Sequence, residues 1–151
     1  MTDPRESPSA MTSEPAGGFA RGVQVAYRVA LLVFLLMGAV QIYLAGLGAF
    51  SKNEHPGFGP HRGLGFAMAG VALVIVVLAL LSRSGGRAVG VSVVILLLAG
   101  LGQSAFAALG ENNAYMGGLH AFDGLVILGL AGFLLGTAVR GSVPGGGSGR
   151  P

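Results

Sequence analysis

Four long apolar runs constrain the fold of this 151-residue chain more than any other feature of its sequence. They lie at about residues 26–50, 62–82, 88–109 and 118–139. A helix needs about 20 apolar residues to cross a bilayer core of about 30 Å, and each run is long enough. Only 10% of the residues are charged, whereas soluble proteins contain about a quarter. The sequence therefore predicts an all-α membrane protein whose four spans form an up-down bundle.

The segments outside the spans differ in composition from the spans. Residues 1–22 are rich in Pro, Ser and acidic side chains, and residues 141–151 are rich in Gly. Such segments bury too little apolar surface to fold alone. They are predicted to be disordered tails around one transmembrane domain at residues 23–140. The chain has no Cys, which excludes disulfides and thiolate ligands, and no basic run that would indicate nucleic-acid binding.

The charges that flank the spans predict the orientation in the membrane. Seven arginines lie on one side of the bundle: Arg5, Arg21, Arg28, Arg83, Arg87, Arg140 and Arg150. The other side carries the basic residues Lys52 and Arg62, which are offset by Glu54 and Glu111. By the positive-inside rule both termini are cytoplasmic. All three histidines then lie on the outer side of the membrane.

Small residues recur at helical spacing in every span and predict the faces through which the helices pack, because membrane helices associate through small residues and interhelical hydrogen bonds. The four seams are Gly38, Gln41, Ala45 and Gly48; Gly63, Ala67 and Gly70; Gly100, Gln103 and Ala107; and Gly129, Gly132 and Gly136. Such faces are also suited to a membrane-protein partner or a second copy of the chain. Gln41 and Gln103 are interpreted as links between helices or as donors to a ligand. No strong internal repeat is evident, although the second and fourth spans both open with a histidine followed closely by glycine.

The polar residues within the spans gather in the outer half of the membrane and define a candidate site. His61 and His120 open the second and fourth spans, which are diagonal neighbours in a sequential up-down bundle. Their imidazoles could therefore face each other and ligate a haem b from both sides. Arg62 could pair with a propionate, Asp123 could orient His120, and Gln41 and Gln103 lie at a similar depth.

Other chemistries fit the same residues. Zinc or copper could bind nitrogen and oxygen ligands drawn from His55, His61, His120, Asp123 and Glu111. His120 and Asp123, three residues apart on one helical face, could form the protonatable pair of a small transporter or sensor. A purely structural role is the plain alternative for each of these residues. The motifs GxSxG and HExxH and the P-loop are absent, so no catalytic residue is assigned and an enzyme is not favoured.

Several segments carry a resemblance to a known family. "QIYLAGLGAF" closes the first span, "FGPHRGLGF" opens the second, Gln103 lies late in the third, and "LHAFDGL" opens the fourth. Over about residues 25–140 this order resembles a family of small bacterial four-helix membrane proteins of unknown function. The resemblance implies the fold and a bacterial cytoplasmic membrane, and it covers Gln41, His61, Gly65, Gln103 and His120.

A second and shorter similarity concerns chemistry. "HR" at the start of one span and "LH" at the start of another are similar to helices of haem A synthase and cytochrome b-type bundles, whose histidines ligate haem. Three hypotheses for the function follow. The first is a non-catalytic accessory subunit, the second a b-type haem protein for electron transfer, and the third a proton-coupled transporter or sensor.

Overall fold

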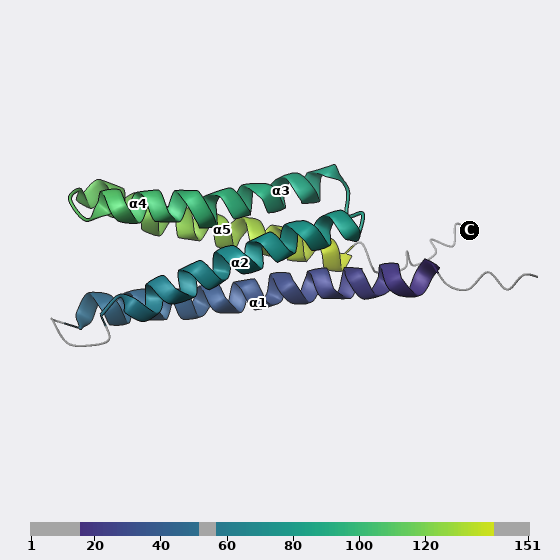
Figure 1. The fold of residues 1–151 in the computed structure, drawn as a ribbon, viewed down its shortest axis with the longest axis horizontal. Coiled ribbons are helices and arrows are strands. Elements are labelled where there is room, and N and C mark those ends of the chain that lie inside the picture. The colour runs from purple at the N-terminus through teal and green to yellow at the C-terminus, as the bar shows by residue number, and fades with distance from the viewer. Residues whose placement is uncertain (1–15, 52–56, 141–151) are drawn as a thin grey trace, which may run out of the picture.

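The computed structural model describes residues 16–51 and 57–140, which form four long apolar helices connected up and down (Figure 1). The first span is α1 (Ala16–Phe50), the second is α2 (Gly59–Leu81) and the fourth is α5 (Ala114–Arg140). The third span is composite. It consists of α3 (Gly86–Leu97), a π-helical segment η1 (Leu98–Gly102) and α4 (Gln103–Gly110). The predicted four-helix bundle is confirmed, and the chain is a multi-pass membrane protein.

The helices are longer than the apolar runs from which they were predicted. The largest difference is in α1, which begins at Ala16 rather than at about residue 26, so residues 16–22 are helical and are not part of a disordered tail. Apolar length indicates which part of a helix can lie in the bilayer and does not mark where the helix ends. The rest of the predicted tails and His55 lie outside the described residues.

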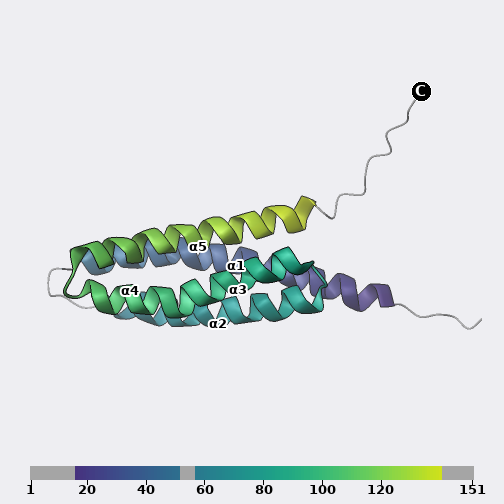
Figure 2. The same cartoon turned by 90° about the horizontal axis from the view of Figure 1, so that it is seen from above.

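The four spans form a closed square. Neighbouring helices pack as α1 against α2, α2 against α3, α3 and α4 against α5, and α5 against α1. Within the described helices, the diagonal partners α2 and α5 make no backbone contact. Figures 1 and 2 show this from two sides, with the hairpin of α1 and α2 beside the hairpin formed by the third and fourth spans. Any direct contact across the α2–α5 diagonal must therefore come from side chains.

The two ends of the bundle differ in character. One end holds the α2–α3 turn and carries Arg21, Arg28, Arg83, Arg87 and Arg140, and we call it the arginine end. The opposite end carries His61 and His120, and we call it the histidine end. The hydrophobic core runs from the middle of the bundle to the arginine end: Tyr27, Leu31, Phe34, Met68, Ala72, Ile75, Ala79, Ile95, Ile127, Ala131 and Leu134. At the histidine end, residues 59–67, 103–110 and 114–122 contain no fully buried residue.

The predicted small-residue seams of the second and fourth spans do not face the bundle interior. In α1 the prediction agrees with the structure, since Gly38 lies against Leu128 and Gly48 against Phe58. In the other spans, a Cβ added at Gly63, Gly70, Gly100, Gly129 or Gly132 would meet no atom within 4 Å. Helical spacing shows that residues share a face but does not show where that face points. The close positions inside α2 and α5 are occupied by Ala72, Ala79 and Ala131, which are fully buried.

Candidate functional site

Gln41 and His61 join α1 to α2 by two reciprocal hydrogen bonds. The Gln41 side-chain Nε2 donates to the backbone oxygen of His61 at 2.9 Å. The His61 Nδ1 lies 3.2 Å from the backbone oxygen of Gln41. Each residue thus contributes one side-chain and one main-chain group, and we call this arrangement a Gln–His clamp. The clamp fixes the His61 ring relative to α1.

Gln103 and His120 form the same clamp between α4 and α5. The Gln103 Nε2 donates to the backbone oxygen of His120 at 2.9 Å, and the His120 Nδ1 lies 3.1 Å from the backbone oxygen of Gln103. The second clamp has one additional member, because the Gln103 Nε2 also donates to Asp123 Oδ2 at 2.9 Å. Both hydrogens of this amide are therefore used. Asp123 is buried, and Gly102 leaves room for it, since a Cβ there would lie 3.3 Å from Asp123 Oδ2.

The two hairpins place matching residue types at corresponding positions of α2 and α5, although no strong sequence repeat is evident. Adding 59 to a residue number in α2 gives its counterpart in α5, and the interior stripe matches throughout: His61 with His120, Gly65 with Gly124, Met68 with Ile127, Ala72 with Ala131, Ile75 with Leu134 and Ala79 with Ala138. Sequence identity along this stripe is confined to His, Gly and Ala. The match is visible in the hydrogen bonds because they pair the same residue types in each hairpin.

The π-helical segment explains how the third span matches the first. In α1, Gln41 lies seven positions after buried Phe34. At 3.6 residues per turn this step places the two side chains within about 20° of one face. In the third span, Gln103 lies eight positions after buried Ile95, which in a regular α-helix would turn Gln103 about 80° away from Ile95. The π-helix Leu98–Gly102 absorbs the extra residue. Gln103 can therefore face His120 as Gln41 faces His61.

A glycine follows each histidine by four residues and makes space for the clamp. A Cβ at Gly65 would lie 3.1 Å from the Gln41 Nε2, and a Cβ at Gly124 would lie 3.9 Å from the Gln103 Nε2. One turn after the histidine, a side chain would project toward the incoming amide. The recurrence of glycine after histidine was the sequence signal for this feature.

The clamps determine which ring nitrogen of each histidine is available. A carbonyl oxygen only accepts hydrogen bonds, so each Nδ1 carries a proton and each neutral ring has its lone pair on Nε2. Neither Nε2 has a hydrogen-bond partner among the described residues. The ring centroids of His61 and His120 are 6.0 Å apart, and the ring planes are inclined by 66°. The structure therefore brings together two imidazoles, each with an uncommitted Nε2, across the diagonal of the bundle.

The remaining predicted site residues take other positions. Asp123 makes no hydrogen bond to His120, and its contact with the histidine runs through Gln103. The Arg62 Nη2 lies 3.4 Å from Glu111 Oε1, in an exposed ion pair between α2 and the end of α4. Among the described residues no three His, Cys, Asp or Glu side chains gather into a metal site. Gln41 Oε1 is buried and has no hydrogen-bond partner.

A second polar region was not expected from the sequence. Tyr27 is 2% exposed and packs in the core near the arginine end. It lies inside α1, at the start of the predicted first span. Buried Ser92 and Ser82 lie at the same end. The sequence feature that could have indicated this region is a tyrosine at the border of a predicted span.

Comparison with known proteins gives one match. Residues 41–109 match the model of a family described as "Family of unknown function (DUF6220)". The match runs from Gln41 to Leu109 and includes His61 and Gln103, but it ends before His120. No curated protein and no solved structure shows significant similarity to the chain. From the first clamp to the end of its third span, this multi-pass membrane protein is similar to a family of unknown function.

Proposed function

We propose that the protein binds one haem b between His61 and His120 and serves electron transfer within the membrane. The observation that carries the proposal is the pair of clamped imidazoles, each with Nδ1 bonded to a backbone carbonyl and Nε2 uncommitted. Metal-ligating histidines characteristically donate their other ring N–H to a carbonyl or carboxylate, which fixes the tautomer and the ring orientation. Two histidines held in this way are prepared to ligate a metal before the metal arrives.

The ring separation fits two histidines that would hold one metal centre together. Metal–imidazole bonds are about 2 Å long, so both rings would lie within a few ångströms of the metal. The observed separation is 6.0 Å. Haem also needs only two protein ligands, whereas a structural zinc site needs four, and the described residues contain no cluster of three.

The surroundings of the histidines support a bound group. Neither the start of α2 nor α4 contributes a fully buried residue, although both lie within the apolar spans. Buried Gln41 Oε1 lacks a partner beside His61. Buried polar atoms of this kind usually have a hydrogen-bond partner, which a ligand or a water could supply. Haem iron would supply a one-electron redox centre, and the clamps would hold its axial ligands.

The distribution of arginine supports an orientation for the proposed site. The arginine end carries five described arginines, while Arg62 is the basic residue described at the histidine end. By the positive-inside rule both termini are cytoplasmic and the haem lies in the outer half of the membrane. The membrane is then the bacterial cytoplasmic membrane, in keeping with the resemblance to small bacterial membrane proteins.

An accessory subunit remains the second candidate, and one observation favours it. Gly63, Ala67 and Gly70 of α2 are exposed, and a Cβ on either glycine would meet no atom within 4 Å. Small residues on a lipid-facing surface allow another helix to approach closely. Substitution of Gly70 by Ile would then abolish co-purification with a larger complex or a second copy in mild detergent. An unchanged elution profile would exclude this face as the contact.

The haem proposal is tested by optical titration of the detergent-purified protein with ferric haem. The expected result is a sharp Soret band that saturates at one haem per chain. His61→Ala and His120→Ala should each abolish it, and His55→Ala is the control because it removes the third histidine of the sequence. A wild-type protein that stays colourless after reconstitution, or binding that survives both substitutions, would refute the proposal.

A further inference from the structure

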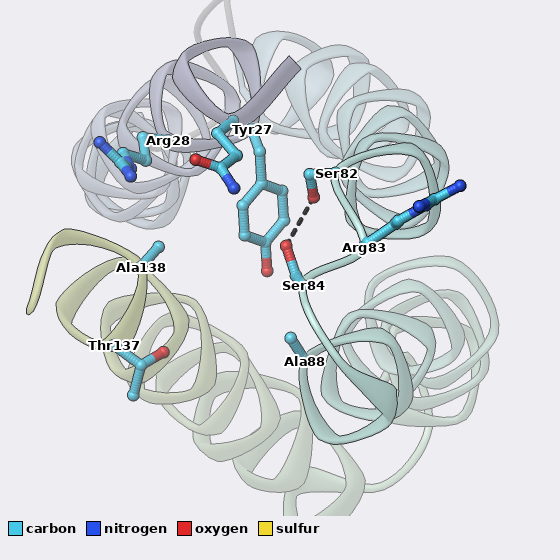
Figure 3. A pocket seen from close by; sticks show the side chains of 9 residues that line it. Tyr27, Arg28, Ser82, Arg83, Ser84, Ala88, Thr137 and Ala138 are labelled. Atoms are coloured by element: carbon cyan, nitrogen blue, oxygen red, sulfur yellow. Dashed lines mark hydrogen bonds between the residues drawn. The ribbon is translucent and has the colours of Figure 1, made fainter. Parts of the chain in front are cut away.

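A cavity of about 280 Å³ opens at the arginine end of the bundle, far from the histidines. Its walls come from α1, the α2–α3 turn, the start of α3 and the end of α5: Gln24, Tyr27, Arg28, Ser82, Arg83, Ser84, Ala88, Thr137 and Ala138. Figure 3 shows that Tyr27 points into the space enclosed by these elements, with Ser84 opposite. Most of the lining side chains are polar or cationic.

Tyr27 is the most informative residue of this cavity. Its side chain is 2% exposed, and its hydroxyl is buried with no hydrogen-bond partner of acceptable geometry. The Ser92 hydroxyl lies nearby and donates to the backbone oxygen of Ala88 at 2.9 Å, so its oxygen could only accept from Tyr27. Burial of a hydroxyl without a partner is unfavourable. A ligand oxygen that accepts from Tyr27 would remove this cost.

The electrostatics of the cavity favour an anion. Arg28 and Arg83 lie at its rim, and Figure 3 shows their side chains on opposite sides with the guanidinium groups directed outward. Arg87 stacks over the Phe133 ring at 5.1 Å and lines an adjoining cavity of about 160 Å³. Among residues 16–51 and 57–140 the acidic side chains are Glu111 and Asp123, and both belong to the histidine half. Arginine and hydroxyl donors without a carboxylate form a typical phosphate-binding environment.

The cavity lies at a depth in the membrane where phosphate groups are present. The turn at Ser82–Gly85 joins two membrane spans, so the cavity lies at the level of the lipid headgroups. We propose that this cavity binds a phosphate group, with Tyr27 as the hydroxyl donor and Arg28 and Arg83 as the charged rim. The Ser84 hydroxyl is already hydrogen-bonded to the hydroxyl of Ser82. An anionic phospholipid headgroup and free phosphate share this chemistry. The proposal is independent of haem binding, because the two sites share no residue.

The test measures thermal unfolding of the full-length protein in detergent with three added probes: phosphatidylglycerol, phosphatidylcholine and sodium phosphate, the last against sodium chloride of equal ionic strength. A ligand that binds the folded state raises the unfolding midpoint in proportion to its occupancy. Tyr27→Phe removes the hydroxyl and keeps the ring. Tyr43→Phe is the matched control, since Tyr43 lies in the same helix and is 68% exposed.

We expect phosphatidylglycerol to raise the midpoint more than phosphatidylcholine, with an affinity about tenfold lower in Tyr27→Phe and unchanged in Tyr43→Phe. This result with no response to sodium phosphate identifies a lipid headgroup. The same dependence on Tyr27 with sodium phosphate alone identifies the free ion. Equal affinity in wild type and Tyr27→Phe for every probe, or no stabilisation by any of them, would overturn the proposal.

Discussion

In the first hairpin an uninterrupted α-helix carries Gln41 to His61, whereas in the second Gln103 follows a π-helical turn and also holds Asp123. The bonds between glutamine and histidine are nevertheless the same in both. Their lengths agree within 0.1 Å, at 2.9 Å for both amide bonds and 3.2 and 3.1 Å for the imidazole bonds. Two different helices thus converge on one arrangement of the histidine. The orientation of the histidine ring is therefore the feature that the two hairpins share.

A change in the helical register of Gln41 should have the largest effect on haem affinity. Inserting one alanine between Ala39 and Val40 turns Gln41 by about 100° relative to Phe34 and should break the first clamp. Because loss of a partner that orients a metal ligand typically costs about 10- to 100-fold in affinity, haem binding should weaken by that factor. Deleting Leu101, which is 71% exposed, is the opposite change. It removes the extra residue of the third span and should leave affinity near wild type.

Equal weakening by the insertion and the deletion, measured in the same haem titration, would mean that the π-helical segment does not serve the register of Gln103. No effect of the insertion would mean that the first clamp does not support haem binding.

Removal of Asp123, the additional carboxylate of the second clamp, should have the next largest effect, which is on the free energy of unfolding. The counterpart of Asp123 in α2 is Leu64, which cannot accept a hydrogen bond. A double-mutant cycle between Gln103→Ala and Asp123→Ala should show a coupling of about 1 kcal/mol, within the range for side-chain hydrogen bonds in membrane proteins. The matched cycle between Gln41→Ala and Leu64→Ala should show a coupling near zero. Free energies of unfolding from titration with denaturing detergent give both values, and similar couplings would contradict the difference between the clamps.

The glycines after the histidines should respond unequally to substitution by alanine. The new Cβ would lie 3.1 Å from the Gln41 amide in Gly65→Ala but 3.9 Å from the Gln103 amide in Gly124→Ala. Gly65→Ala should therefore be less stable than Gly124→Ala by about 0.5 kcal/mol, close to the average for one such hydrogen bond. The helix-propensity gain of alanine is the same at both sites and cancels. The reverse order of stability would show that the clamp does not need this space.

Loss of the ion pair between the two hairpins should change the free energy of unfolding least. The side chains of Arg62 and Glu111 are 71% and 65% exposed, and their charged atoms are 3.4 Å apart. Exposed pairs contribute little, so Arg62→Gln should leave the free energy of unfolding within about 0.3 kcal/mol of wild type. A larger loss of unfolding free energy in the same assay would show that this ion pair, rather than the hydrophobic core, holds the two hairpins together.

The sequence was sufficient for the spans and for the placing of the histidines on one diagonal. Apolar length identifies membrane helices, and sequential up-down connection makes the second and fourth spans diagonal. It was not sufficient for the clamps, because each bond joins a side chain to a main-chain oxygen of another helix and depends on which face points inward. The same limitation explains why the predicted small-residue seams of the second and fourth spans do not pack in the interior. The π-helical turn could be inferred only after Ile95 and Gln103 were both known to face inward.

The central claim is that His61 and His120 ligate one iron together, and electron paramagnetic resonance of the ferric, haem-reconstituted protein tests it most directly. Two axial imidazoles produce a low-spin signal, and loss of one ligand converts it to high spin. The account predicts a low-spin spectrum for the wild type and for His55→Ala, and the same conversion for His61→Ala and His120→Ala. A high-spin wild-type spectrum, or a low-spin signal that persists in either variant, would contradict shared ligation.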